Sequence, residues 1–291
     1  MCVCTWIGTP HRFSNMPTVI TSIQNPRVKH LVALRERRQR DADGLMLVEG
    51  YDELTLALAT VKPRALFYCP EIVRDSAQLH LLEQASAASV ELVQVNERVF
   101  EKIAYRANPD GWLGVFPLHR SSLSELRLSP TPLLIIAEGI EKPGNLGAIL
   151  RTADAAAVDA LISCDAVTDL GNPNVVRASK GAVFSVPVVE TTVVVCVDWL
   201  HAHGIKILAA TPQAKNDYTE VDMRGPIAIA VGAEKLGLTP YLLEQADVSV
   251  SIPMLGRVNS LNVSIATALL VYEALKQRRI TVQTGLYSTG S

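Results

Sequence analysis

Small polar side chains and a glycine gather at residues 252–264, in the run Ile-Pro-Met-Leu-Gly-Arg-Val-Asn-Ser-Leu-Asn-Val-Ser. Amide and hydroxyl groups beside open backbone N–H groups at a helix start can hold a polar ligand. The same residue types are also the preferred helix N-caps. Because one helix needs one cap and the loop offers Asn259, Ser260 and Asn262, both a binding role and a capping role remain open.

Two further polar segments lie upstream. Residues 144–151 read Gly-Asn-Leu-Gly-Ala-Ile-Leu-Arg, where the glycines allow a ligand to approach and Arg151 adds a fixed positive charge. Residues 232–238 read Gly-Ala-Glu-Lys-Leu-Gly-Leu and place the carboxylate of Glu234 in a turn. Taken singly, the first can be an ordinary capped helix, and Glu234 can simply favour a helix dipole.

The usual motifs of several enzyme classes are absent from the sequence. It has no G-x-G-x-x-G followed about 20 residues later by an acid, which argues against a Rossmann dinucleotide site. It also lacks the glycine-rich first loop of a Rossmann-like methyltransferase. The motifs G-x-x-x-x-G-K-[ST], G-x-S-x-G and H-E-x-x-H are missing too, so the ATPase, hydrolase and zincin classes lose their support.

Alternating strands and helices predict a larger domain at residues 133–280. The continuous apolar run at residues 133–137 is typical of a strand buried on both faces. We expect a mostly parallel sheet covered by helices on both faces, with ligands bound at the carboxyl ends of its strands. The strands are predicted at residues 133–137, 160–164, 186–189, 206–210, 227–231 and 248–252, and the helices at 148–157, 175–183, 193–203, 240–245 and 261–278.

The first half predicts a smaller three-layer α/β domain at residues 18–117. Residues 118–132 are rich in Ser and Pro and read as a linker, while residues 1–17 and 281–291 read as tails. The strands are predicted at residues 45–49, 64–69, 90–95 and 112–116, and the helices at 25–40, 51–60, 77–88 and 97–104.

Length and composition suit two globular domains, since 291 residues of which 48% are hydrophobic can fill two cores. No apolar run reaches the roughly 18 residues of a spanning helix. The N-terminus has no basic residue before its short apolar patch, so we expect a cytoplasmic protein without a secretory signal. The five cysteines are scattered without a CxxC pair, and we predict neither a disulfide nor a metal site.

Positive charge is concentrated at residues 27–40. This segment carries six Arg and Lys residues against Glu36, a net +5, which leaves the rest of the chain at -2 minus +5, or -7. A basic helix face could neutralise phosphates of RNA, but most charge runs are solvated surface helices. The charge alone leaves these two interpretations equal.

Together, the three polar segments resemble, in order and spacing, the three motifs of the SpoU (TrmH-like) branch of the SPOUT RNA methyltransferases. The run Asn-Pro-Asn-Val-Val-Arg-Ala-Ser-Lys-Gly at residues 172–181 also resembles the family segment between motifs one and two. The resemblance spans about residues 133–278, and no motif position departs from the family pattern. The matches are Asn145 and Arg151 for motif one, Gly232 and Glu234 with residues 237–238 for motif two, and residues 252–264 for motif three.

The first domain resembles, less specifically, the L30-like substrate-binding domain that precedes this catalytic domain in ribosomal RNA methyltransferases. The matching features are residues 23–29, the basic segment and Leu-Val-Glu-Gly at residues 47–50. This resemblance implies an RNA-binding role for the basic segment and argues against the short transfer-RNA enzymes. The implied RNA contacts are Arg27, Lys29, Arg35 and Arg38.

The family resemblance implies S-adenosylmethionine as cofactor, bound in a C-terminal trefoil knot of a parallel-sheet fold, within a homodimer and without a metal. It implies methyl transfer to a ribose 2′-hydroxyl, with 23S ribosomal RNA as the expected substrate. The implied cofactor contacts are Gly232, Ile252, Leu261, Thr211 and Met254.

A 2′-hydroxyl is a weak nucleophile, so the site must assist loss of its proton or stabilise the alkoxide, and hold it in line with the methyl group. The family resemblance makes Arg151 the candidate for this activation. A guanidinium group keeps its proton, so we expect Arg151 to grip phosphate and favour the alkoxide rather than act as a base. Residues expected to position Arg151, the ribose and the backbone are Asn145, Glu234, Ser260 and Asn262.

Three alternatives remain at this point. The chain could be a transfer-RNA 2′-O-methyltransferase, or a non-catalytic RNA-binding or ribosome-assembly protein that keeps the basic segment. It could also methylate a base, such as guanine N1, which requires an acid placed to take a ring proton.

Overall fold

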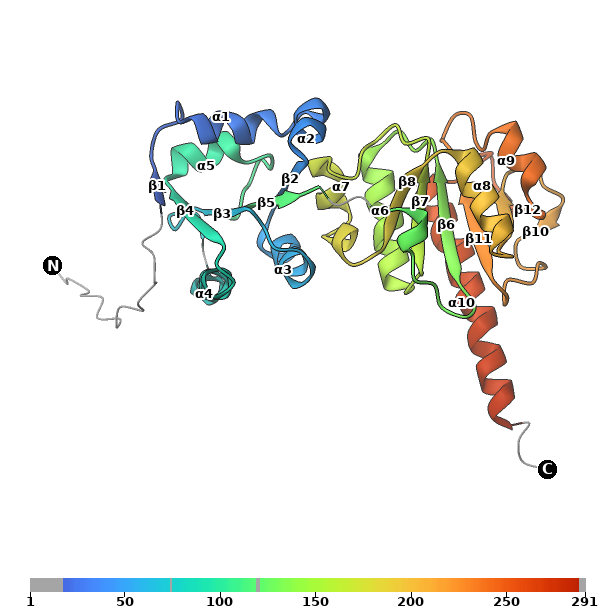
Figure 1. Cartoon of the computed structure of the whole chain (residues 1–291). Helices are drawn as coiled ribbons and strands as arrows, with labels where there is room; N and C mark the ends of the chain where they lie inside the picture. Colours follow the sequence, from blue (N-terminus) through green and yellow to red (C-terminus); the bar gives the residue numbers. More distant parts are fainter. Residues whose placement is uncertain (1–17, 74, 119–120, 288–291) are drawn as a thin grey trace.

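The computed structural model of the chain describes residues 18–73, 75–118 and 121–287, so the predicted tail at residues 1–17 lies outside the described residues. Within the described residues the strands form two sheets, of five and seven strands. The sheets occupy the two halves of an elongated molecule (Figure 1).

The N-terminal half is a three-layer α/β unit. Its strands are β1 (Thr18–Ile20), β2 (Leu45–Glu49), β3 (Ala65–Tyr68), β4 (Glu91–Val95) and β5 (Trp112–Pro117), and its helices are α1 (Pro26–Ala33), α2 (Arg37–Asp43), α3 (Tyr51–Thr60), the 3-10 turn η1 (Ser76–Leu79), α4 (His80–Ala87) and α5 (Glu97–Ile103). The sheet order is β1-β4-β3-β5-β2, with β5 antiparallel to both of its neighbours. Helices α1 and α5 pack on one face and α3 and α4 on the other, which agrees with the predicted layers.

The basic segment is two helices rather than the single predicted helix of residues 25–40. Asn25 caps α1 by accepting from the Arg27 N–H, and Val28 and Leu31 bury its apolar face. The chain then turns, because the guanidinium of Arg40 binds the carbonyl oxygens just after α1 that a continued helix would use. Periodicity could not reveal this, since Arg40 is buried although its charge suggests an exposed residue.

The C-terminal half holds a fully parallel sheet in the order β10-β12-β9-β11-β6-β7-β8. Its strands are β6 (Leu133–Glu138), β7 (Ala160–Cys164), β8 (Val188–Thr191), β9 (Lys206–Ala210), β10 (Asn216–Asp217), β11 (Ile227–Val231) and β12 (Val248–Ser251). Its helices are α6 (Pro143–Ala155), α7 (Pro173–Ala178), the 3-10 turn η3 (Ala182–Phe184), α8 (Val193–Ala202), α9 (Pro240–Gln245) and α10 (Val263–Tyr287).

Two apolar cores enclose this sheet. Helices α6, α7 and α10 pack on one face, and α8 and α9 on the other. Every residue of β6, β7 and β11 is buried, as their continuous apolar runs predict. The α/β fold with a parallel sheet is therefore confirmed, while the trefoil knot stays a prediction.

Several predicted boundaries were wrong. Helix α6 begins at Pro143 instead of residue 148, because proline suits the first helical position and the N–H groups of Asn145 and Leu146 already bond to Lys142 O. Helix α7 ends at Ala178, and Gly181 then adopts φ +84°, so the predicted helix 175–183 breaks. Strand β8 lies two residues later than predicted. Helix α10 continues to Tyr287, beyond the predicted start of the tail at residue 281.

The predicted linker is packed rather than a loose connection. Leu123, Leu126 and Leu128 contact the apolar core beneath α8 and α9. The carboxylate of Asp159 accepts from the Ser129 N–H at 2.7 Å and, with its other oxygen, from the Leu133 N–H at 2.9 Å. Serine and proline suggested a flexible tether, but the interspersed leucines anchor the segment on the sheet.

Candidate active site

The carboxyl ends of β12, β9, β11 and β6 meet at one edge, because these parallel strands are adjacent in the sheet. The segments that follow β6, β11 and β12 are the three polar segments of the sequence. Ligands of open parallel sheets bind at this edge.

A cavity of about 730 Å³ opens between the ends of β9, β11 and β12 and the start of α10. Its volume suits a nucleoside-sized ligand, since ligand pockets span about 300–1,000 Å³. All five predicted cofactor contacts line it, together with Glu234, Ser260 and Asn262. The five are Thr211, Gly232, Ile252, Met254 and Leu261.

Gly232 shapes one wall of this cavity. A Cβ atom at this position would lie 2.2 Å from the carbonyl carbon and oxygen of Gly237. Gly237 itself has φ +68°, and it exchanges two backbone hydrogen bonds with Ala233. The two glycines therefore allow a tight turn whose backbone faces the cavity, as a cofactor approached closely by the main chain requires.

A polar network joins all three segments beside the cavity, which Glu234 and Asn262 line. Asn145 Nδ2 donates to Glu234 Oε1 at 2.8 Å. Asn262 Nδ2 donates to Asn145 Oδ1 at 3.1 Å and to Glu234 Oε1 at 3.2 Å. Lys142 forms an ion pair with the same carboxylate. Three residues predicted from sequence to act together thus lie in direct contact, with Lys142 as a fourth member.

The Glu234 carboxyl is held in its ionised form. Hydrogen bonds from Lys142, and then from Asn145, hold its pKa below the ordinary value of 4.5. A general base works best with a pKa near the operating pH, so Glu234 is better suited to orienting neighbours than to accepting a proton.

Asn262 caps α10 and also contacts the polar network, while its predicted role in binding a ligand stays a prediction. Its Oδ1 accepts from the Ser264 N–H at 3.0 Å, and its backbone carbonyl accepts from the N–H groups of Ile265 and Ala266 in the first turn of α10. Its Nδ2 meanwhile binds the polar network. The cap of α10 therefore also fixes the third polar segment against the other two.

Arg151 and Ser260 stand apart from this network. Arg151 is exposed on α6 and does not line the cavity, and its guanidinium has no hydrogen-bond or ion-pair partner among the described residues. Ser260 is exposed and lines the cavity, but it makes no hydrogen bond within the described part of the chain. Their predicted roles in activating or holding a substrate stay predictions.

Sequence reasoning missed two supporting residues. Lys142 looked like an ordinary surface lysine before a proline. Glu138, at the end of β6, is 3% exposed, and its carboxylate accepts from the N–H and hydroxyl of Thr239 at 2.8 and 2.7 Å. Glu138 thereby anchors the end of the second polar segment. The apolar strand that precedes Glu138 in the sequence does not reveal this long-range contact.

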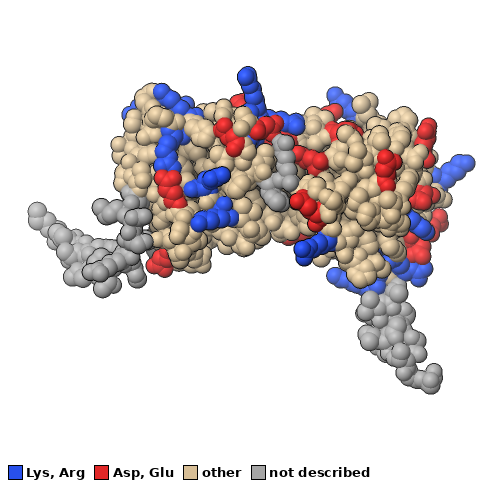
Figure 2. Space-filling model, in the orientation of Figure 1, with Lys and Arg blue, Asp and Glu red and all other residues tan. Residues whose placement is uncertain are grey.

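The four predicted RNA contacts differ in their surroundings. Arg27 makes a bidentate ion pair with Glu91, and Arg35 donates to the carbonyl oxygens of residues 102 and 104. The side chains of Lys29 and Arg38 are exposed and have no polar partner among residues the structure describes. Figure 2 shows Lys and Arg side chains along the upper surface of the N-terminal half, interspersed with acidic ones.

Cys69, Cys164 and Cys196 are buried free thiols, as their apolar segments predict, and burial raises the pKa of Cys69 to about 12. Cys2 and Cys4 lie outside the described residues. Among the residues described, no group of three His, Cys, Asp or Glu side chains is arranged to hold a metal ion. Each described helix is too short or too polar to span a bilayer.

Known RNA methyltransferases resemble this chain over both of its halves. Residues 132–272 match the SpoU rRNA Methylase family, and residues 25–114 match the MRM3-like substrate binding domain. The 23S rRNA (guanosine(2553)-2′-O)-methyltransferase RlmP of Bacillus subtilis (strain 168) is 29% identical, over 87% of this chain and 97% of that protein.

Two solved structures share the whole architecture. A crystal structure of an RNA 2′-O ribose methyltransferase is 40% identical with a TM-score of 0.78, over 90% of this chain and 99% of that one. The AdoMet-bound rRNA methyltransferase from Sinorhizobium meliloti is 30% identical with a TM-score of 0.80, over 89% of this chain and 97% of that one. The chain therefore belongs to the SpoU family of RNA methyltransferases and carries a substrate-binding domain ahead of its methylase domain.

Proposed function

We propose that this enzyme transfers a methyl group from S-adenosylmethionine to a ribose 2′-hydroxyl, in 23S ribosomal RNA. The observation that carries the proposal is the cavity bordered by the network of Asn145, Glu234 and Asn262. The names of RlmP and of the AdoMet-bound relative support the substrate and the cofactor.

The residues of the cavity suit this cofactor. Apolar side chains of Ile252 and Leu261 can cover an adenosine, while backbone groups at Gly232 can bind its polar edge. When bound, the cofactor supplies an electrophilic methyl group. We expect the polar network to hold the second and third segments in place around it.

Arg151 would act on the RNA side of the site. Its free guanidinium can bind phosphate and stabilise negative charge on the 2′-oxygen as that atom loses its proton. Ser260, at the cavity lining, would help to place the ribose. The proton would leave to phosphate or water, since a guanidinium is a poor base.

We also propose a homodimer joined through α6 and α10. Ile265, Leu269 and Tyr272 follow helical spacing on α10 and are 52%, 38% and 51% exposed. With Ala148 and Thr152 of α6 they line an open groove of about 620 Å³. An exposed apolar stripe marks a partner surface, and a second copy would present the same stripe around a two-fold axis.

The remaining family features belong to the same proposal. The third segment would close a trefoil knot around the cofactor, and Lys29 and Arg38 would contact RNA phosphates. Action on ribosomal RNA would place the enzyme in the cytoplasm.

The decisive experiment supplies labelled S-adenosylmethionine with 23S RNA, 16S RNA or bulk transfer RNA, followed by nucleoside mass spectrometry. A 2′-O-methyl nucleoside in 23S RNA is the expected product. Methylation of transfer RNA would contradict 23S RNA as the substrate. Methylation of a base would contradict the ribose 2′-hydroxyl as the acceptor. Cofactor binding without transfer to any of these three RNAs would leave either a ribosomal particle as the substrate or a non-catalytic RNA-binding protein.

A further inference from the structure

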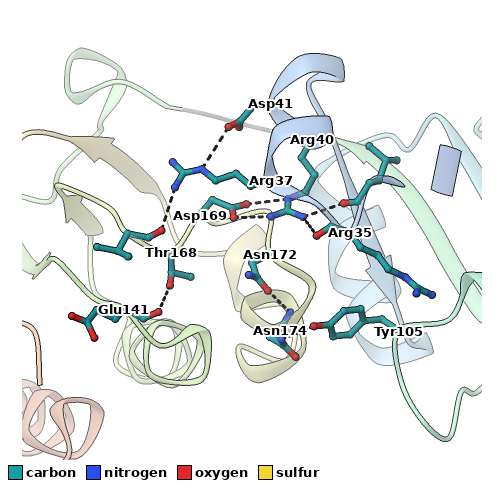
Figure 3. Close-up of polar contacts among 12 residues, drawn as sticks. Arg35, Arg37, Arg40, Asp41, Tyr105, Glu141, Thr168, Asp169, Asn172 and Asn174 are labelled. Atoms are coloured by element: carbon teal, nitrogen blue, oxygen red, sulfur yellow. Dashed lines mark hydrogen bonds and ion pairs between the residues drawn. The ribbon is translucent and has the colours of Figure 1, made fainter. Parts of the chain in front are cut away.

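A buried ion pair joins the substrate-binding domain to the methylase domain. Arg40 of α2 donates from Nε to Asp169 Oδ1 at 3.0 Å and from Nη2 to Oδ2 at 2.7 Å. Asp169 lies in the loop of residues 165–172 between β7 and α7 (Figure 3). Only 1% of Arg40 and 4% of Asp169 is exposed. Because a planar guanidinium makes such a bidentate contact in one orientation, the pair restricts how the domains meet.

Further contacts surround this pair. Arg37 Nη1 donates to the carbonyl oxygen of Val167 at 3.2 Å, in the same loop (Figure 3). Asn174 Nδ2 donates to the Tyr105 hydroxyl at 2.8 Å. Val176 of α7 lies in an apolar core formed mainly by the substrate-binding domain. The two domains therefore share a packed junction.

The loop of residues 165–172 also reaches the proposed methyl-transfer site. The hydroxyl of Thr168 donates to the carbonyl oxygen of Glu141 (Figure 3). Glu141 directly precedes Lys142, which pairs with Glu234 in the polar network. Of the adjacent residues Thr168 and Asp169, Thr168 is thus bonded to the residue before Lys142, and Asp169 is bonded to the substrate-binding domain.

We propose that Arg40 and Asp169 form an interdomain latch that positions bound RNA relative to the methyl-transfer site. This inference rests on the proposed function. Folding stability alone does not explain the buried pair, because apolar residues of similar size often stabilise a core as much as a buried ion pair does. Two RNA-binding surfaces strengthen each other only when their geometry lets both engage one substrate. A directional contact supplies that geometry.

Two variants test the latch. Asp169→Asn keeps the shape of the side chain and removes its charge, while Arg40→Ala removes the guanidinium. Arg224→Ala is the matched control, because it breaks an exposed bidentate pair with Asp222 inside the methylase domain. Each is assayed on a long 23S RNA fragment and on a short hairpin around the nucleotide that the wild type methylates.

For both latch variants we expect the KM for the long fragment to rise about tenfold or more, because simultaneous engagement is lost. The KM for the hairpin and the affinity for S-adenosylmethionine should stay at wild-type values, as should every parameter of the control. An unchanged KM for the long fragment in folded Asp169→Asn would overturn the latch. An equal rise for both RNAs would overturn it too, because the pair would then act within the methylase domain alone.

Small-angle X-ray scattering tests the same inference without any substrate. The wild type should scatter as the structure predicts, and Asp169→Asn should show a larger maximum dimension. If Asp169→Asn scatters like the wild type, the latch is wrong even if the proposed activity is right. If the wild type methylates no RNA while Asp169→Asn still expands, the proposed function fails separately and the pair remains a domain-orienting contact.

Discussion

Arg151 is the residue on which the proposed chemistry depends most. It lies about 9 Å along the α6 axis from Asn145, and it does not line the cavity. We predict that Arg151→Ala lowers kcat about 100- to 1,000-fold, since removing one donor to a developing oxyanion has this effect. Calorimetry should find the affinity for S-adenosylmethionine unchanged. Parallel loss of activity and cofactor binding would show that Arg151 has been assigned the wrong role.

Glu234 should act as a constant negative charge. Its lowered pKa means that the ionised form persists above the ordinary value of 4.5 and is lost only as the pH falls through the lower folded value. We predict that Glu234→Gln lowers kcat/KM about 10- to 100-fold by loosening the network. The dependence of kcat/KM on pH between about pH 6 and 9 should keep the shape that the wild type shows. An acidic limb near neutral pH that vanishes in this variant would instead identify Glu234 as a base.

The packing of α6 on α7 depends on one glycine. A Cβ at Gly147 would lie 2.4 Å from Ala178 Cβ and 2.8 Å from the Ser179 nitrogen, whereas a Cβ at Gly144 would meet nothing within 4 Å. We predict that Gly147→Ala lowers the free energy of unfolding by about 1–3 kcal/mol through overpacking. Gly144→Ala, in the same helix, should leave it unchanged or raise it by up to about 1 kcal/mol.

Urea unfolding of these two variants measures the difference directly. Equal midpoints for Gly147→Ala and Gly144→Ala would mean that α6 and α7 separate readily. Because α6 carries both Asn145 and Arg151, that result would also weaken the case for a rigid site.

The proposed homodimer can be tested by charging one residue of the exposed stripe. Ile265 is 52% exposed and lines the groove beside α6. We predict that Ile265→Glu raises the dissociation constant of the dimer more than 100-fold, because an unpaired charge buried between copies costs about 3 kcal/mol or more. Analytical ultracentrifugation should detect a monomer.

The matched control for the dimer is Val194→Glu. Val194 is 48% exposed on α8, on the opposite face of the sheet from α10. This variant should sediment like the wild type. A dimer lost in both variants, or in neither, would contradict an interface formed by α6 and α10.

At the scale of the whole molecule, the sequence by itself determined most of the order of strands and helices and the three segments that would form the site, but not the short edge strands β1 and β10 or the division of the basic segment into α1 and α2. Buried parallel strands such as β6 and β11 reveal themselves because both faces must be apolar. Asn145 and Glu234 were recognisable because each follows such a strand, and Asn262 because it lies in the polar segment after the half-buried strand β12; parallel strands place their carboxyl ends together.

The tertiary structure decided which polar groups meet. Arg40 and Asp169 are 129 residues apart, and their pairing buries two charges and joins the domains, while the same guanidinium binds the carbonyl oxygens that end the first basic helix. The packing of the linker leucines on the core and the contact of Lys142 with Glu234 are likewise long-range contacts that the tertiary structure decided. Local periodicity reports which face of an element is buried, but long-range pairing of charges depends on chain geometry that only the folded molecule supplies.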